Sequence, residues 1–179
     1  FDTSYFNSWE DQLINNQTIT WTTPPTFNLW TLAERIPEGY HFTVPLRDQD
    51  EHTYVFSDKF SGEITSKAKA QYGISSTFRQ GYMTESWNKN CIALGEASFC
   101  IESLDSPFMG TLLKQLDLMS KFLPSQDRIT YTQHYECLMQ NIFTFTTASY
   151  QTQKNDSAYW KYVENIKPCL LYTSDAADE

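Results

Sequence analysis

A long alternation of apolar and polar residues, at positions 64 to 82, sets the strongest limit on how this sequence can fold. The even positions carry nearly all of its apolar side chains. The charged residues all lie on odd positions: Lys67, Lys69 and Arg79. Because successive side chains of a β-strand point to opposite faces, the pattern predicts an unusually long strand with one apolar face. A helical periodicity covers only its first part, through Ile64, Ala68 and Tyr72.

Other short runs rich in β-branched and aromatic residues also indicate strands. They lie at residues 18–22, 40–44, 53–56, 91–103 and 142–148. Proline and glycine at positions 24–25 and 37–39 mark turns between them. The strands are short and connected by brief turns, which favours antiparallel pairing.

Two helices are expected between the last two predicted strands. Ser106 can act as an N-cap, Pro107 suits the first helical position, and apolar residues then recur at helical spacing as far as Phe122. Pro124 ends this helix, and a second helix is predicted over residues 128–141. The order of elements therefore predicts an α+β fold with an antiparallel sheet.

The composition excludes two classes of partner or location. The formal net charge is −9 and no basic face is evident, so nucleic acid is not an expected partner. No run of 18 apolar residues could cross a bilayer as a helix. Hydrophobic residues make up 40% of the chain, which is enough for a packed core.

The last eleven residues, CLLYTSDAADE at positions 169–179, resemble the translation of a sequencing adapter in one reading frame. They are therefore expected to be a non-native tail and are excluded from fold reasoning. Because this tail holds three acids and no bases, its removal changes the net charge from −9 to −6. The sequence also begins with Phe1 rather than Met, so a fragment open at both ends is expected.

The remaining cysteines, Cys91, Cys100 and Cys137, show no zinc-ligand spacing. The favoured interpretation is that they are small buried hydrophobic residues. A single disulfide among them remains an alternative.

No motif in the sequence supports catalysis. The three histidines, His41, His52 and His134, have no partners at metal-ligand spacing, and neither a Gly-x-Ser-x-Gly motif nor a phosphate-binding glycine loop occurs. Glu96 and Glu102 fall on one side of a predicted strand, where a solvated face is favoured over a paired-acid site. The sequence therefore predicts a protein that is not an enzyme, with no catalytic residue, metal or cofactor.

The order of parts resembles the membrane attack complex/perforin (MACPF) family of pore-forming proteins. The matching segments are a first strand region at 40–56, an inserting segment at 61–86, a second strand at 90–104, the helix pair, and a third strand at 142–146. At the family's signature motif this chain has Phe143, Thr144 and Phe145, of which only Thr144 matches. The resemblance implies a bent antiparallel sheet with flanking helical clusters. Residues 1–36 would be an irregular N-terminal part, and 37–168 a C-terminally truncated MACPF-like core.

The resemblance also implies a function: oligomerisation on a lipid membrane and conversion of an amphipathic segment to a transmembrane β-hairpin. A bilayer-spanning strand needs about 9–11 residues with alternating faces, as the stretch from position 64 provides. The lipid-facing side chains would be Ile64, Ala68, Ala70, Tyr72, Ile74 and Phe78. The expected partners are the membrane and further copies of the chain, and the expected location is secreted or at the cell surface. The alternative is a non-catalytic adhesion or structural binding module.

Overall fold

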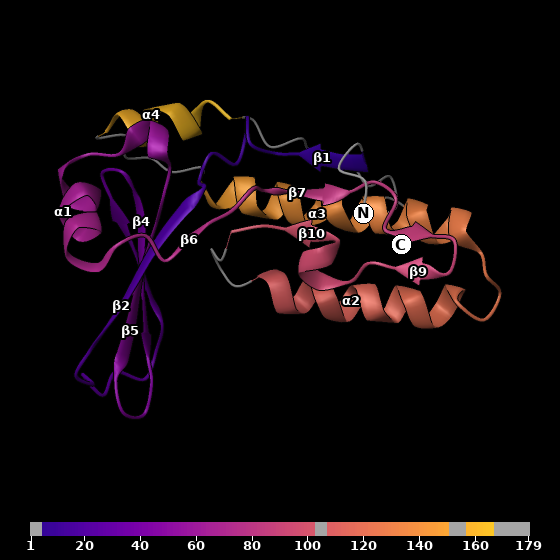
Figure 1. Ribbon diagram of the computed structural model, residues 1–179, viewed down its shortest axis with the longest axis horizontal. Helices are drawn as coiled ribbons and strands as arrows, with labels where there is room; N and C mark the ends of the chain where they lie inside the picture. Colours follow the sequence, from indigo (N-terminus) through magenta and orange to yellow (C-terminus); the bar gives the residue numbers. More distant parts are fainter. Residues whose placement is uncertain (1–4, 103–106, 151–156, 167–179) are drawn as a thin grey trace, which may run out of the picture. The chain divides into compact units, whose positions relative to one another are not determined.

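The computed structural model describes residues 5–102, 107–150 and 157–166 (Figure 1). Contacts divide the chain into two compact units. We call residues 8–80 and 152–165 the sheet unit, and residues 1–7, 81–151 and 166–179 the helix unit. The domain boundaries expected at residues 36 and 168 stay a prediction.

The sheet unit is built on a five-stranded antiparallel sheet with the strand order β3-β4-β5-β2-β6. Its strands are β2 (Gln17–Thr23), β3 (Leu32–Ile36), β4 (Gly39–Pro45), β5 (Asp50–Phe56) and β6 (Ser76–Thr77). The 3-10 turn η2 (Asp58–Phe60) and the helices α1 (Glu63–Tyr72) and α4 (Ala158–Glu164) complete it. The strands predicted at 18–22, 40–44 and 53–56 are confirmed as β2, β4 and β5.

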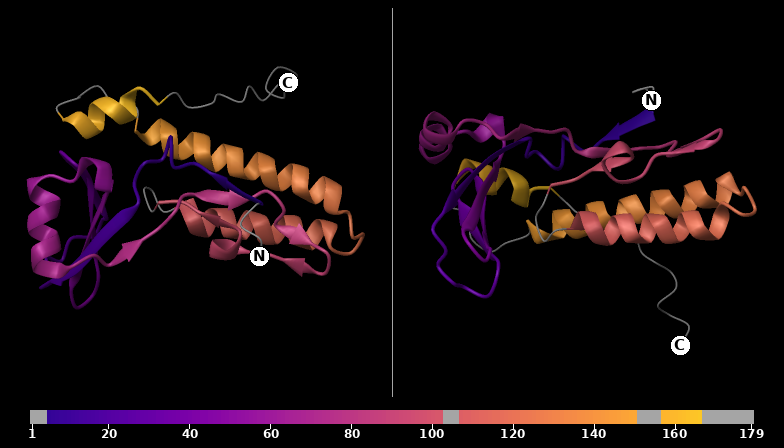
Figure 2. Two further views of the ribbon diagram at one scale, coloured as in Figure 1. Left: turned by 45° about the horizontal axis from the view of Figure 1, so that its top comes forward. Right: turned by 60° about the horizontal axis from the view of Figure 1, so that its bottom comes forward.

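The core of the sheet unit lies between the sheet and helix α1, which Figure 2 shows beside the strands. Ile19 of β2 and Phe56 of β5 are fully buried and pack with Ala68 of α1. Complete burial of a side chain of this size contributes about 1.5–3 kcal/mol. Helix α4 is joined to the sheet through Trp160, whose indole Nε1 donates to the Ile36 carbonyl at 2.8 Å.

The single long strand expected from the alternation after position 64 is wrong, because its first half forms helix α1. In its second half only Ser76–Thr77 and the stretch from Gly81 are strands, and they belong to different sheets. The carboxylate of Glu38, distant in sequence, accepts the first free N–H groups of this helix, from Ile64 at 3.1 Å and Thr65 at 2.8 Å. Such capping satisfies donors that a helix otherwise leaves unpaired. Gly73, at a φ of +77°, then ends the helix.

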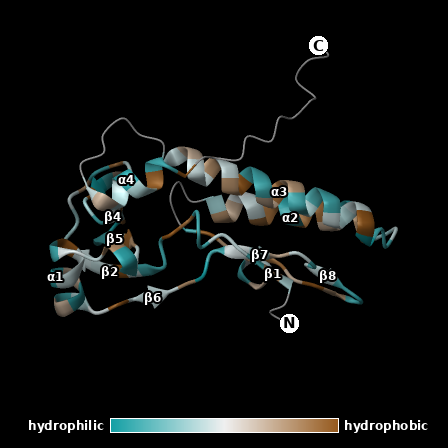
Figure 3. Cartoon of the chain, turned by 90° about the horizontal axis from the view of Figure 1, so that it is seen from above, coloured by the Kyte–Doolittle hydropathy of each residue, from teal (hydrophilic) through white to brown (hydrophobic). Residues whose placement is uncertain are grey.

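The helix unit contains two long antiparallel helices, α2 (Pro107–Phe122) and α3 (Arg128–Ser149), which lie side by side in Figures 1 and 3. A three-stranded sheet has the order β1-β7-β10, with β1 (Phe6–Ser8), β7 (Gly81–Met83) and β10 (Phe99–Cys100). A hairpin of β8 (Trp87–Asn88) and β9 (Cys91–Ile92) and the 3-10 turn η3 (Gly95–Ala97) complete this unit.

Helix α2 has the predicted bounds, but two other predictions in this unit are wrong. The strand expected at 142–148 is the continuation of α3, because Ile142, Phe143, Thr146 and Thr147 are buried at helical spacing. The signature positions Phe143, Thr144 and Phe145 therefore lie within a helix. The strand expected at 91–103 is interrupted by η3, where Gly95 adopts a φ of +56°. Residues 103 and 106 lie outside the described ranges.

The three cysteines of the described residues are free. Cys91 and Cys137 are exposed, contrary to the expectation that they are buried, and only Cys100 is partly buried. Burial, with a smaller contribution from the Glu96 carboxylate, raises the pKa of the Cys100 thiol. The adapter-like tail lies outside the described residues.

Candidate functional site

A groove of about 270 Å³ lies between the N-terminal part of α2 and the C-terminal half of α3. It is lined by Pro107, Gly110, Thr111, Lys114, Leu138, Asn141, Ile142 and Phe145. The first turn of α2 contains no acidic residue, and Lys114 adds a cation one turn further on. The exposed N–H groups at a helix N-terminus carry partial positive charge and attract anions. The groove therefore suits an anionic group that lies against an apolar wall.

A buried hydrogen-bond network holds α2 against the segment around η3. The side-chain carbonyl of Gln115 accepts the Gly95 N–H at 3.1 Å, and its amide donates to the Ala93 carbonyl at 3.0 Å. The Tyr135 hydroxyl of α3 donates to the Ser98 carbonyl at 2.9 Å. Gln115 and Tyr135 are fully buried, so these bonds are shielded from water. Residues 93–98 are thereby fixed to both long helices.

The two glutamates considered for a paired-acid site are not brought together. Glu96 is exposed in η3, whereas Glu102 is buried and its carboxylate accepts a hydrogen bond from the hydroxyl of Tyr150. The solvated strand face expected for both residues is therefore wrong for Glu102. The turn at η3 breaks the strand in which Glu96 and Glu102 were expected to point to the same side.

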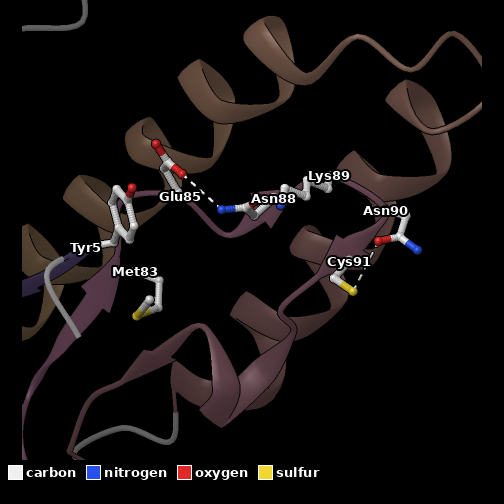
Figure 4. Close-up of a pocket in the computed structure, with 7 residues that line it drawn as sticks. All are labelled: Tyr5, Met83, Glu85, Asn88, Lys89, Asn90 and Cys91. Atoms are coloured by element: carbon white, nitrogen blue, oxygen red, sulfur yellow. Dashed lines mark hydrogen bonds between the residues drawn. The ribbon is translucent and has the colours of Figure 1, made fainter. Parts of the chain in front are cut away.

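A second hollow, of about 300 Å³, lies beside the β8–β9 hairpin (Figure 4). It is lined by Tyr5, Met83, Glu85, Asn88, Lys89, Asn90 and Cys91. Figure 4 shows the Glu85 carboxylate turned toward the Asn88 amide, which donates to it at 3.3 Å, with Cys91 at the opposite end from Tyr5. No histidine lines this hollow to activate the Cys91 thiol. Its side chains therefore do not form a nucleophile–base pair.

The sheet brings together two of the three histidines. His41 Nε2 lies 3.2 Å from His52 Nδ1, because β4 and β5 pair with His52 opposite Thr43 and His41 opposite Tyr54. His134 lies apart on α3, where its Nδ1 is 2.9 Å from the Thr130 carbonyl oxygen. The sequence spacing of the histidines could not reveal this pair. The pairing register of β4 and β5, which the turn after Pro45 sets, places both histidines on one face of the sheet.

The six residues expected to face lipid do not share one face. Ala68 is buried and Ile64 partly buried, whereas Ala70, Tyr72 and Ile74 are exposed. Phe78 lies beyond β6 and is partly buried. The helical turn of residues 63–72 separates side chains that a strand would have aligned.

Comparison with known proteins identifies the family. The family model described as tryptophan halogenase matches residues 3–172. Tryptophan 6-halogenase SttH from Streptomyces toxytricini is 23% identical over 180 residues, which cover 87% of this chain and 34% of that protein. The match to the family model extends over nearly the whole chain, although identity to this relative is low.

Solved structures of halogenases share the fold. The tryptophan halogenase of Shewanella frigidimarina NCIMB 400 superposes with a TM-score of 0.78 at 20% identity, over 88% of this chain and 35% of that one. BrvH, a flavin-dependent halogenase from Brevundimonas sp. BAL3, gives 0.78 at 17% identity, over 90% of this chain and 37% of that one. The chain thus spans about a third of the length of these relatives.

These findings overturn the resemblance to MACPF proteins. The bent sheet with helical clusters is wrong, because the fold is that of the halogenases. A pore-forming function, the alternative of a non-catalytic adhesion or structural module, and the expectation that the protein is not an enzyme are contradicted by a family of halogenating enzymes. The membrane and oligomer partners and the secreted or cell-surface location depended on the same resemblance and are contradicted with it.

The described residues contain no helix that is both long and apolar enough to cross a membrane. The length of the match to the family model, from residue 3 to residue 172, decides the assignment. This chain belongs to the tryptophan halogenase family.

Proposed function

We propose that this chain is part of a flavin-dependent halogenase that places a halogen atom on the indole ring of tryptophan or a related compound. The observation that carries the proposal is the family match over residues 3–172. The names of two relatives, a tryptophan 6-halogenase and a flavin-dependent halogenase, supply the substrate class and the cofactor. Because the chain spans about a third of these relatives, it supplies only part of the enzyme.

The overall chemistry explains why a flavin suits this function. Replacement of an aromatic C–H hydrogen by a halogen from a halide ion requires the removal of two electrons from the halide. A reduced flavin with O₂ supplies that oxidation: the arene, halide, O₂, reduced flavin and a proton yield the haloarene, oxidised flavin and water. What the protein must add is a place for the flavin, a place for the indole and protection from bulk water.

The groove at the N-terminal part of α2 fits an anionic group of a flavin. Lys114 and the helix N-terminus offer positive charge, and Gly110 leaves open space where a side chain would stand. Phe145 and Ile142 provide an apolar wall for an aromatic ring system. The buried bonds of Gln115 hold α2 in place against residues 93–98, so the groove is supported by a rigid segment.

The test uses the complete protein that contains this chain, supplied with tryptophan, bromide, a source of reduced flavin, and air. Mass spectrometry should show a tryptophan product in which bromine replaces hydrogen, recognisable by its isotope doublet, and none without oxygen. A protein that binds flavin yet brominates neither tryptophan nor simpler indoles would contradict the proposed function.

The substitution Lys114→Ala tests whether the groove binds the flavin. We expect the variant to need several-fold more flavin for half-maximal activity, because it loses the cation that lines the groove. Lys121→Ala on the same helix is the matched control, since Lys121 lies outside the groove and pairs with Asp117 at 2.7 Å. Equal flavin requirements in both variants would place the flavin elsewhere.

A further inference from the structure

A cleft of about 480 Å³ lies in the helix unit, between the β8–β9 hairpin and the turn that joins α2 to α3. We call it the turn cleft. Lys89 and Arg128 supply two cations to its lining, and Asn90 and Gln126 supply two side-chain amides. None of the described residues that line it carries a carboxylate. The polar part of the lining therefore consists of amides and positive charge.

The two cations of the turn cleft have no carboxylate partner within the described ranges. Neither Lys89 nor Arg128 forms an ion pair there, whereas Lys121 of the same unit does. The carboxylate of Asp127 is engaged as the N-cap of α3, and that of Glu85 accepts a side-chain amide of the hairpin. Acids outnumber bases in the chain by 22 to 13, so two cations without acidic partners are a place where a ligand can supply the negative charge.

Two backbone conformations that favour glycine position donors of the turn cleft. Three residues other than glycine have a left-handed φ within the described ranges, and two of them line this cleft: Lys89 and Gln126, both at +53°. Lys89 is the first residue of the two-residue turn between β8 and β9, where glycine or asparagine is preferred. A long side chain in this conformation costs free energy, and such residues cluster at binding sites.

Hydrogen bonds hold both turns in place. The indole Nε1 of Trp87 donates to the Lys89 carbonyl at 3.2 Å. In the other turn, the Gln126 N–H donates to the Leu123 carbonyl at 3.1 Å, and the Arg128 N–H donates to the Gln126 carbonyl at 3.0 Å. The backbone on both sides of the cleft is thus ordered before a ligand arrives, which lowers the entropic cost of binding.

The lining matches the phosphate group of a small organic compound. A phosphate monoester carries nearly two negative charges at neutral pH and three strong acceptor oxygens, whereas a carboxylate carries one charge and two oxygens. The guanidinium of Arg128 can bind two phosphate oxygens at once, and the ammonium of Lys89 acts as a point charge. Trp87, Ile92 and Leu123 form an apolar side for the organic part, and the volume is in the range of small-molecule pockets.

We propose that the turn cleft binds a small organic phosphate through Lys89 and Arg128. The groove proposed for the flavin uses the N-terminal part of α2, including Gly110, whereas the turn cleft lies beyond the end of this helix at Phe122. Roughly 18 Å of helix separates Gly110 from Phe122. Phosphate binding at the turn cleft is therefore a property separate from halogenation.

The test is a calorimetric titration with phenyl phosphate of the complete protein that contains this chain, in a buffer of low ionic strength. We expect saturable binding, which Lys89→Gln and Arg128→Gln should each weaken at least about fivefold through loss of a charge-assisted hydrogen bond. Lys121→Gln makes the same change of charge on α2 outside the cleft and is the matched control, with affinity unchanged. Circular dichroism verifies that the variants remain folded.

Two further ligands separate the contributions of charge and ring. Benzoate keeps the ring but carries one charge, and inorganic phosphate lacks the ring, so both should bind several-fold more weakly than phenyl phosphate. The proposal is excluded if Lys89→Gln and Arg128→Gln bind phenyl phosphate as the wild type does, or if benzoate binds as tightly as phenyl phosphate. Absence of saturable binding would exclude it equally. Weakening by Lys114→Gln instead would place the phosphate in the groove of α2 and overturn the assignment to the turn cleft.

Discussion

The side-chain carbonyl of Gln115 accepts the backbone N–H of Gly95 at 3.1 Å, in the interior of the helix unit. Gly95 has a φ of +56°, a conformation that residues with side chains rarely adopt. A single amide thus holds a turn that requires glycine against the middle of α2. Because the same helix lines the groove proposed for the flavin, this contact links local stability to the geometry of the groove.

Gln115→Leu should destabilise the helix unit substantially. Leucine preserves the volume but leaves the Gly95 N–H and the Ala93 carbonyl without their partner, and each buried unpaired group costs about 1–3 kcal/mol. Urea unfolding followed by circular dichroism measures the loss. Gln133→Leu, at an exposed position of α3, should shift the free energy of unfolding by less than about 0.5 kcal/mol. Equal effects would show that the buried amide has no special role.

Glu38 should make the stability of the sheet unit depend on pH. Burial alone would raise the pKa of Glu38, but hydrogen bonds from Thr65, Ile64 and Gly62 outweigh burial and hold the pKa below its ordinary value. A carboxyl with a lowered folded-state pKa contributes stability that is fully present above the unfolded pKa, about 4.3. That contribution is lost as the pH falls through the folded-state pKa.

Glu38→Gln should therefore lower the free energy of unfolding at pH 7 by about 1.5–3 kcal/mol, the value of hydrogen bonds to a charged group. The difference between wild type and variant should shrink as the pH approaches 3, which thermal unfolding across a pH series can follow. Glu63→Gln is the control, because its exposed ion pair with Lys67 contributes little. A difference that stays constant with pH would rule out the charged cap.

Two glycines should respond to alanine in opposite directions. A Cβ atom at Gly39 would lie 2.1 Å from the Val55 carbonyl oxygen, a backbone atom of the neighbouring strand that cannot move aside. Gly110 lies inside helix α2 with open space around the same position. Gly39→Ala should lower the melting temperature strongly or prevent folding, whereas Gly110→Ala should stabilise α2 by about 0.5–1 kcal/mol. A stabilised Gly39→Ala would show that β4 and β5 pair differently.

Sequence patterns predicted those elements whose formation depends on neighbouring residues alone. The bounds of α2 follow from Pro107 and a helical apolar stripe that ends at Phe122. The strands β2, β4 and β5 follow from β-branched and aromatic runs between turn residues. In each case propensity, pattern and terminating residues favour the same structure.

The errors arose where distant residues decide the structure. Helix α1 depends on the Glu38 carboxylate at its N-terminus and on burial of Ala68 against the sheet, neither of which an alternating pattern contains. Residues 142–149 remain helical because α3 buries Phe143 and Thr147, although their composition is typical of a strand. Because helices were predicted as strands at these two places, the predicted order of elements resembled that of the MACPF family. The histidine pair depends on strand register. The similarity to SttH covers 87% of the chain at only 23% identity.

Tyr135 and Tyr131, one helical turn apart on α3, are both fully buried, with parallel rings whose centroids lie 6.1 Å apart. The Tyr135 hydroxyl donates to the Ser98 carbonyl, and burial raises the pKa of Tyr135, so it remains a protonated donor at neutral pH. Within the described part of the chain, the Tyr131 hydroxyl is buried without a hydrogen-bond partner. Removal of the oxygen should therefore have different consequences at two similar positions.

Tyr135→Phe should cost about 0.5–1.5 kcal/mol, the net contribution of one buried hydrogen bond, because the Ser98 carbonyl keeps its bond from the Met83 N–H at 2.7 Å. Tyr131→Phe removes a polar atom that gains nothing from its surroundings, so it should be neutral or stabilising. Urea unfolding of both variants and of the double variant measures these effects, with near-additivity expected because the hydroxyls have no shared partner. Equal destabilisation by the two single variants would indicate that the Tyr131 hydroxyl also has a partner, such as a buried water.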